Sequence, residues 1–436
     1  MSSISIPPGQ KLKILVLAFF LGIAAWPAAG QEDPFEALDK LLEGNFEDID
    51  RSLEEQYQLI DDALESGNAR LAEEIISFWG QDETKLPSKK QWVDYSQDFQ
   101  TRRVIDFEAG IVKVERLVSQ DESIIKVIDD INEAAKSVAS DSMVDLSEKD
   151  LALSYARESL AEDGIELSEA PVGSTAPILG EVSYKLDSAR LESLVIAASE
   201  NSDVAKSGMA EIQEAEEKKP AEQSVPIEKK ISASVKKIDN GKKVVRVEIP
   251  LRQNYDAVLA NKYAVEISHE AEIQNLPPSL LFAVMETESN FNPRARSAVP
   301  AFGLMQLVPR SGAMDAYEYV HGEKVLLDPE YLYQADNNVE LGAAYLSVLQ
   351  NRYLKRISNP LTREYCAIAA YNTGAGNVAR SFVGTNSVRA AVEIINGMTP
   401  SEVYDHLEQK LPYEETRRYI KKVTKAKTKY EDYDDI

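Results

Sequence analysis

The strongest constraint on the fold is a succession of amphipathic helical segments in the second half of the chain. From Asp256 onward, apolar residues recur at helical spacing, and Pro, Gly or Asn separates one segment from the next. The pattern predicts a loop over 317–328 and helices over 263–274, 278–290, 339–352, 363–371, 388–396, 400–409 and 417–428. Consecutive helices without an intervening strand pattern indicate a mainly α-helical domain over residues 255–430.

One of these helices carries a carboxyl group in an unusual position. Prolines near 277 mark its start, since proline is tolerated in a first helical turn, and Pro293 is predicted to end it. Leu281 and Val284 recur at helical spacing, and Glu288 falls next in that row. Burial among apolar groups raises the pKa of a carboxyl group, as a general acid for glycosidic bond cleavage requires. A Glu on the solvated flank of a surface helix fits the helix pattern equally well.

Two segments that follow carry further candidate site residues. Ser297 and the stretch 303–306 come shortly after the helix, where Gly303 permits close backbone approach and Gln306 offers an amide that can donate to and accept from a sugar. Farther on, Tyr371 and Asn372 lie where a small-residue helix meets a Gly-rich turn. Aromatic and amide groups at a loop rim suit carbohydrate. The alternatives are a turn followed by a helix start for 303–306, and a helix C-cap for Asn372.

A late aromatic residue completes the set. Tyr419 lies near the start of the last predicted helix, in the stretch Glu-Thr-Arg-Arg-Tyr. Its hydroxyl is a candidate partner for the acid, and an ordinary interfacial aromatic is the alternative. Each segment alone is weak evidence, but their joint order and spacing is not.

Together these residues resemble the lytic transglycosylases of the goose-lysozyme-like superfamily. The E-S-x-F-x-P motif of that family appears at 288–293, G-L-M-Q at 303–306, A-Y-N-x-G at 370–374, and its late tyrosine at Tyr419. Upstream, the segments 78–80, 95–102 and 245–251 resemble the accessory domain of the membrane-bound lytic murein transglycosylase C family. The resemblance implies an α-helical lysozyme-like fold over 255–430, with a groove between helical lobes.

The resemblance also implies a reaction. Glu288 would protonate the oxygen that links N-acetylmuramic acid to N-acetylglucosamine in peptidoglycan, and would then take the proton of the muramic C6 hydroxyl, leaving a 1,6-anhydro end. Glu286 lies two residues away on another helix face, so it cannot be the facing second carboxylate of a hydrolase. No cofactor is implied. By motif match, the substrate-binding residues would be Ser289, Ser297, Met305, Gln306, Tyr371, Asn372 and Tyr419.

Two other functions remain open from the sequence. A hydrolytic muramidase on the same fold would use a second carboxylate from another element. A non-catalytic cell-wall-binding protein would keep the groove without the acid, and the presence of Glu288 argues against it. Peptidoglycan glycan strands are the expected partner, together with cell-wall or divisome proteins that would bind through the accessory domain.

The first half of the chain predicts an α+β accessory domain over residues 31–254. Residues 35–76 have helical spacing, 104–115 alternate on both sides of Ala109-Gly110 as a β-hairpin does, and 242–251 alternate as a single strand. The stretch 199–237 is rich in Glu, Lys, Ala and Ser and predicts a largely flexible insertion. An acidic tail closes the chain at 431–436.

The first 30 residues predict a signal peptide and therefore a periplasmic protein. Lys11 and Lys13 precede an apolar run over 14–26 that is short for a membrane span, and small residues follow at 28–30. An uncleaved N-terminal anchor is the alternative. No cysteine follows this segment, so lipoprotein anchoring is not expected, in contrast to the family that the accessory domain resembles.

Charge and metal-binding residues exclude two further classes of function. Lys plus Arg total 48 against 73 Asp plus Glu, a net charge of −25, and nucleic-acid binding needs a basic face. The only cysteine is Cys366, and the three histidines, His269, His321 and His406, are far apart in the sequence. No metal site is therefore expected.

Overall fold

The computed structural model describes residues 34–119, 122–167, 176–180, 188–200, 231–238 and 241–435. The chain divides into two compact units, Met1–Glu54 and Glu55–Ile436. In the first unit, only the backbone of helix α2 (Pro34–Trp79), which continues into the second, is described. The predicted signal peptide and residues 201–230 of the predicted insertion lie outside the described residues.

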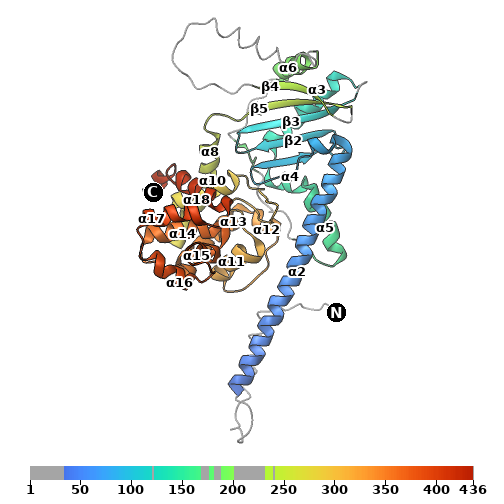
Figure 1. Ribbon diagram of the computed structural model, residues 1–436. Coiled ribbons are helices and arrows are strands. Elements are labelled where there is room, and N and C mark those ends of the chain that lie inside the picture. Colours follow the sequence, from blue (N-terminus) through green and yellow to red (C-terminus); the bar gives the residue numbers. More distant parts are fainter. Residues whose placement is uncertain are drawn as a thin grey trace, which may run out of the picture. The chain divides into compact units, whose positions relative to one another are not determined.

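Residues 55–250 of the second unit, called here the sheet region, form an antiparallel sheet with helices. Its strands are β1 (Gln91–Tyr95), β2 (Thr101–Asp106), β3 (Ile111–Val118), β4 (Ser232–Lys237) and β5 (Lys243–Pro250), in the order β1-β2-β3-β5-β4 (Figure 1). Its helices are the second part of α2, α3 (Ile124–Ser140), α4 (Met143–Glu148), α5 (Leu151–Glu162), α6 (Ser188–Glu200) and a 3-10 turn at Gln81–Glu83. The predicted hairpin is β2–β3, the predicted strand is β5, and α2 covers the predicted helical segment.

Both faces of the sheet are covered, which explains the alternation in its strands. Ile105, Val112 and Val247 lie in the same core as Val127 and Ile131 of α3. Val104, Leu117 and Val244 lie in a second core with Leu71, Ile75 and Trp79 of α2. Successive side chains of a strand point to opposite faces, so β1, β2, β3 and β5 each contribute to both cores.

The prediction for residues 199–237 was wrong at its end. Residues 232–237 form the edge strand β4, paired with β5 from Ser232↔Glu248 to Lys237↔Lys243. Its side chains are small or charged and mostly exposed, so the composition resembled a flexible segment. A strand that gains its hydrogen bonds from a neighbour does not need a hydrophobic pattern of its own. The prediction also missed β1 and the helices α3 to α6.

Residues 255–435, called here the helical region, are mainly α-helical as predicted. The helices are α8 (Tyr255–Lys262), α9 (Ala264–Gln274), α10 (Pro278–Ser289), α11 (Met314–His321), α12 (Pro329–Tyr333), α13 (Ala335–Val348), α14 (Pro360–Thr373), α15 (Ala375–Val383), α16 (Val388–Ile395), α17 (Pro400–Lys410) and α18 (Glu414–Lys427). π-helical turns lie at Pro309–Ala313 and Leu349–Tyr353, and a 3-10 turn lies at Glu431–Asp435. Each of the seven predicted helices is present.

The main errors in the helical region concern short helices. Helix α11 lies partly in the predicted loop 317–328, and α15 follows Gly374 directly, in the predicted Gly-rich turn. Helix α15 is only nine residues long, and α11 eight. Helices this short are marginal in isolation and depend on tertiary packing, which a local pattern does not report.

A capping carboxylate defines the start of α10, and left-handed backbone angles define its end. At its start, Asp434 accepts hydrogen bonds from the N–H and the hydroxyl of Ser279, both at 2.7 Å, so the acidic tail packs on the helical region. At its end, Asn290 and Phe291 adopt left-handed backbone angles with φ 51° and 63°. The helix therefore ends at Ser289, and the prediction that Pro293 ends it was wrong, because the left-handed turn stops it first.

A buried charge cluster joins the helical region to the sheet region. The Arg294 guanidinium donates to both oxygens of Glu330 at 3.0 Å and to Asp150 of the sheet region at 3.2 Å. The hydroxyl of Ser147, also in the sheet region, donates to Glu330 at 2.7 Å. Arg294 and Glu330 are 1% and 0% exposed, so each charge depends on its partner.

Within the described ranges the structure adds two negative findings. No helix there is both long and apolar enough to cross a membrane. No group of three or more His, Cys, Asp or Glu side chains there is placed to hold a metal ion. Cys366 is buried, and burial raises the pKa of its thiol to about 12.

Candidate active site

Glu288 lies in the last turn of α10 and is 4% exposed. Burial is the largest influence on its carboxyl group and raises its pKa above the ordinary range. Lys89, Tyr419 and Lys90 act in the opposite direction, and the Lys89 Nζ lies 3.2 Å from Oε2. The net effect keeps the proton on Glu288 to a higher pH than on a free Glu. The structure thus places the predicted acid in an environment that suits proton donation.

Two tyrosines lie beside this carboxyl group. Tyr371 of α14 is buried, its hydroxyl donates to the Met305 carbonyl at 2.8 Å, and the charge of Glu288 contributes to raising its pKa. Tyr419 of α18 is 5% exposed, and its hydroxyl interacts with Glu288, lowering the pKa of that carboxyl. Among the described residues, however, the Tyr419 hydroxyl has no hydrogen bond of good geometry. This buried hydroxyl is therefore available to the Glu288 carboxylate beside it.

A cavity of about 320 Å³ opens onto Glu288. It is lined by residues of α10, α18 and the segment before β1: Lys89, Lys90, Thr287, Glu288, Glu414, Glu415, Arg418, Tyr419 and Lys422. A cleft of this size with a few convergent polar groups is typical of a ligand site. Only Glu288 and Tyr419 of this set were predicted.

The other carboxylates near Glu288 differ in their position. Glu286 accepts hydrogen bonds from Lys429 at 2.5 Å and from the Tyr430 hydroxyl at 2.6 Å, so it is turned toward the end of the chain. Glu414 and Glu415 are exposed and line the same cavity as Glu288. No carboxylate is among the strongest influences on the pKa of Glu288. Glu414 and Glu415 are nevertheless candidates for a second carboxylate, and the sequence did not reveal them.

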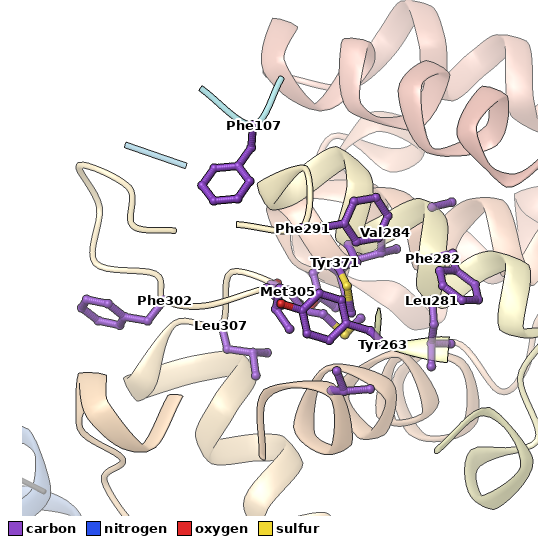
Figure 2. Packing of buried hydrophobic residues seen from close by; sticks show 14 of the residues in the cluster. Phe107, Tyr263, Leu281, Phe282, Val284, Phe291, Phe302, Met305, Leu307 and Tyr371 are labelled. Atoms are coloured by element: carbon purple, nitrogen blue, oxygen red, sulfur yellow. The ribbon is translucent and has the colours of Figure 1, made fainter. Parts of the chain in front are cut away.

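Three predicted substrate-binding residues are instead buried behind the site. Ser289 is fully buried, and its hydroxyl donates to the Met285 carbonyl one turn earlier at 3.1 Å. The side chain of Met305 lies in the core with Val284 and Tyr371 (Figure 2). The amide nitrogen of Gln306 donates to the carbonyls of Ala295 and Gly303. These residues shape the backbone beneath the site, because the Ser289 hydroxyl and the Gln306 amide nitrogen are already used and the Met305 side chain lies in the core. The side-chain oxygen of Gln306 is buried without a hydrogen bond.

The turn that contains Gly303 needs this glycine. Its φ is 78°, and an added Cβ would lie 2.3 Å from both the Asn338 amide nitrogen and the Leu332 carbonyl. Asn338 fills this space: its amide donates to Phe302 and Leu332 carbonyls and accepts from the Met305 N–H at 2.7 Å. The predicted close backbone approach at Gly303 is therefore present. Residues 303–306 form the turn of the alternative prediction, but no helix starts there.

Two predicted residues lie farther out. Asn372 is half-buried and its side-chain oxygen accepts from the Thr416 hydroxyl at 2.7 Å, which ties α14 to α18 near the site. Ser297 donates to the Val299 carbonyl and lines a separate cavity of about 730 Å³. Lys89 and Lys90 line both this cavity and the one at Glu288. The structure brings Glu288, Tyr371 and Tyr419 together and places Ser297 on the other side of the two lysines.

Lys89 and Lys90 are two further site residues that the sequence did not reveal. They precede β1 in the sheet region, 199 and 198 positions before Glu288. A Lys-Lys pair after Pro87-Ser88 carries no local signal of function. Only the arrangement of the two regions brings these ammonium groups to the carboxyl group.

Comparisons with known proteins cover both regions. Residues 266–393 match the Transglycosylase SLT domain, and residues 57–150 match the N-terminal domain of Membrane-bound lytic murein transglycosylase C. The chain is 31% identical to Membrane-bound lytic murein transglycosylase C of Klebsiella pneumoniae, over 83% of this chain and 87% of that protein. It is 29% identical to that of Haemophilus influenzae over the same shares.

Among solved structures, the chain is similar to an inactive mutant of lytic transglycosylase Slt from Pseudomonas aeruginosa. The identity is 27%, the TM-score is 0.30, and the match covers 38% of this chain and 24% of that chain. The helical region has the lysozyme-like fold of the SLT domain that it matches.

Proposed function

This chain belongs to the family of membrane-bound lytic murein transglycosylase C, and from that membership we propose how its residues cleave peptidoglycan. It is a lytic transglycosylase. We propose that Glu288 is its acid and base, that the bond cleaved is the β-1,4 bond between N-acetylmuramic acid and N-acetylglucosamine, and that the product has a 1,6-anhydro end. The burial of Glu288 beside Tyr419 is the observation that carries this proposal.

The proposed reaction has two proton transfers at one carboxyl group. Protonated Glu288 gives its proton to the glycosidic oxygen as the bond to C1 of the muramic residue breaks, which releases the N-acetylglucosamine hydroxyl. The Glu288 carboxylate then takes the proton of the muramic C6 hydroxyl, whose oxygen bonds to C1. The carboxyl group ends protonated, so the reaction consumes no water and requires no second carboxylate. The raised pKa of Glu288 supports the first transfer.

Tyr371 and Tyr419 are proposed to bind substrate beside Glu288. The Tyr419 hydroxyl has no hydrogen bond of good geometry, and Tyr371 holds the Met305 carbonyl beneath the site. Asn372 is proposed to act through Thr416, which it binds. Ser297 is proposed to contact substrate only if the glycan extends past Lys89, because it lines the second cavity.

Hydrolysis is the second candidate function, because Glu414 and Glu415 line the same cavity as Glu288. An inverting hydrolase needs a second carboxylate that activates water. Two observations favour the transglycosylase: both side chains are exposed, and neither is among the strongest influences on Glu288.

We expect mass spectrometry of muropeptides released from purified sacculi to show 1,6-anhydro ends. The physical reason is that one carboxyl group can serve both proton transfers without a water-activating partner. Glu414→Gln and Glu415→Gln should both retain this product. Reducing ends, together with loss of turnover in one of these two variants, would establish the hydrolase instead.

For Tyr419→Phe we expect turnover to fall about tenfold, an order-of-magnitude figure for one hydrogen bond to a charged group. The variant keeps the ring but loses a donor to the Glu288 carboxylate. Because that donor lowers the pKa of Glu288, its loss raises the pKa, and the decline of activity at high pH should begin at a higher pH. The measurement is the initial rate of muropeptide release between pH 4 and 9.

The matched control for this substitution is Tyr404→Phe. The Tyr404 hydroxyl of α17 forms a hydrogen bond with the Thr424 hydroxyl at 3.1 Å, and Tyr404 does not line the cavity at Glu288. The rate and pH profile of Tyr404→Phe should equal those of the wild type. The melting temperature of Tyr419→Phe should not fall, because the lost hydroxyl has no good hydrogen bond. An unchanged pH profile in Tyr419→Phe would remove Tyr419 from the proposed machinery.

We propose a periplasmic location for the enzyme. The basic and apolar pattern of residues 1–30 supports export, and the Klebsiella and Haemophilus relatives are named membrane-bound. The sheet region is proposed as the part that contacts cell-wall or divisome proteins.

A further inference from the structure

Segment 86–90 of the sheet region reaches into the candidate active site. It lies between the 3-10 turn Gln81–Glu83 and β1, and it carries Lys89 and Lys90. The Lys89 Nζ donates to the Glu288 Oε2 at 3.2 Å. Glu288 is almost fully buried whereas the Lys89 side chain is 34% exposed, so an ammonium group near solvent pairs with a carboxyl group in the protein interior.

This segment is held against the turn that follows α10. The side-chain amide of Asn292 donates to the Lys89 carbonyl at 3.2 Å and the Ser88 carbonyl at 3.4 Å. The Lys90 Nζ donates to the Glu286 carbonyl at 2.9 Å and to the Asn290 side-chain oxygen. Two polar side chains thus fix the backbone on either side of Lys89, which defines where its ammonium group can reach.

The other end of the segment is anchored in the sheet. The Lys85 Nζ donates to both oxygens of Glu115 at 3.1 Å, and the Tyr95 hydroxyl donates to the Lys85 carbonyl at 2.9 Å. Glu115 is fully buried and also accepts from Arg102 at 2.6 Å. The segment is therefore fixed at both ends, and Lys89 is supported as site residues must be if they are to act at a defined distance.

We propose that Lys89 is a positioning residue of the reaction, which stabilises the Glu288 carboxylate each time that group gives up its proton. This inference rests on the proposed role of Glu288 as acid and base. Negative charge develops on Glu288 in the first transfer and is present until the second. A fixed ammonium group 3.2 Å away interacts more favourably with that charge than with the neutral acid.

The other groups that face Glu288 do not replace this interaction. Lys90 is on the same segment, but burial lowers its pKa to about 8 and its ammonium group binds the end of α10. Tyr371 of α14 and Tyr419 of α18 are neutral at physiological pH. The charged residues of α18 that line the cavity are Glu414, Glu415, Arg418 and Lys422, and none of them is among the strongest influences on Glu288.

The ammonium group of Lys89 should have opposite effects on enzyme activity at low pH and at high pH. It makes Glu288 a stronger acid and stabilises the carboxylate, which favours proton transfer to the glycosidic oxygen. It also lowers the pKa of Glu288, so less of the enzyme carries the required proton at high pH. Removing the ammonium group should therefore slow turnover at low pH and extend activity to higher pH.

The test compares Lys89→Met with Lys89→Arg on purified sacculi. For Lys89→Met we expect kcat at pH 5 to fall roughly three- to tenfold, KM to change little, and the high-pH decline of activity to move up by about one pH unit. Lys89→Arg keeps the charge and should restore both the rate and the profile. Lys421→Met, which removes one exposed charge paired with Glu408, should behave as the wild type.

Two kinetic outcomes would overturn the proposal. A higher KM with unchanged kcat and pH profile would make Lys89 a substrate contact. Faster turnover at every pH without a shift of the profile would mean that segment 86–90 only obstructs the cavity.

A measurement without turnover separates this inference from the proposed function. Difference infrared spectroscopy between each protein and its Glu288→Gln counterpart follows the Glu288 carboxyl band with pH. The pKa of Glu288 should be about one unit higher in Lys89→Met than in the wild type. If 1,6-anhydro products are absent but this shift is present, the proposed function fails and the Lys89–Glu288 coupling stands. If the shift is absent, the coupling fails whatever the product.

Discussion

Replacing Glu288 with Gln should reduce muropeptide release from sacculi by roughly 10³-fold or more, since general acid–base catalysis contributes about 10²–10⁴-fold and this residue is proposed to serve two transfers. Gln has nearly the same shape but neither donates nor takes a proton at the reacting oxygen. The melting temperature at neutral pH should not fall, because burial disfavours the charged form of the wild-type carboxyl group and Gln is neutral. The initial rate and a thermal unfolding curve measure both effects.

Glu286→Gln is the matched control for this variant. Glu286 lies two residues earlier on α10, and its carboxylate binds Lys429 and the Tyr430 hydroxyl. Glu286→Gln makes the same chemical change on the same helix but leaves the cavity at Glu288 unchanged. Turnover should remain near the wild-type rate. A Glu288→Gln variant that still digests sacculi, or a Glu286→Gln variant that does not, would contradict the assignment of the acid.

Arg294→Met should destabilise the protein by about 3–5 kcal/mol, the range for breaking a buried ion pair by removing one partner. Arg294 and Glu330 are nearly inaccessible to solvent, and Asp150 is 5% exposed. Without Arg294, Glu330 keeps the Ser147 hydroxyl and Arg157, and Asp150 keeps Arg296 at 3.5 Å. Glu330 thus loses the guanidinium that binds both of its oxygens, and Asp150 loses one of its two guanidinium partners. Urea unfolding followed by circular dichroism measures the change.

The double variant Arg294→Met/Glu330→Leu tests the cause. Replacing both charges with apolar groups removes the desolvation cost along with the pair, so the double variant should be more stable than Arg294→Met alone. A double variant that is less stable than the single one would show that packing, and not an unpaired charge, dominates at Arg294. Lys421→Met, at an exposed pair, should leave the unfolding curve unchanged.

The site was predictable from sequence to the extent that its residues follow from local pattern. The helical row places Glu288 on the buried side of α10. The need for glycine at 303 comes instead from a tertiary contact, because Asn338 and Leu332 occupy the space of a Cβ. The burial of Ser289 and Met305 was not predicted, because a motif match does not say which side of the backbone a side chain takes. Ser289 turns inward one position after Glu288 and binds its own helix.

Residues from other elements were not predictable in the same way. Glu414 and Glu415 open α18, and Lys89 and Lys90 precede β1, yet all four line the cavity at Glu288. None of them has a periodicity or a spacing that relates it to α10. Their proximity results from packing between elements, which a sequence pattern within one element does not encode.

The sequence by itself determined the helical region and the central hairpin of the sheet, which follow from side-chain periodicity and turn residues that act over a few positions of the chain. Through its family resemblance it also singled out Glu288 as the proposed acid. Only the tertiary structure decided the electrostatics around that acid. Glu288 has its raised pKa because the protein core removes water from it, and it pairs with Lys89 because segment 86–90 is fixed against Asn290 and Asn292. Coulomb interactions depend on distance in space, and 199 residues of chain separate these two charges.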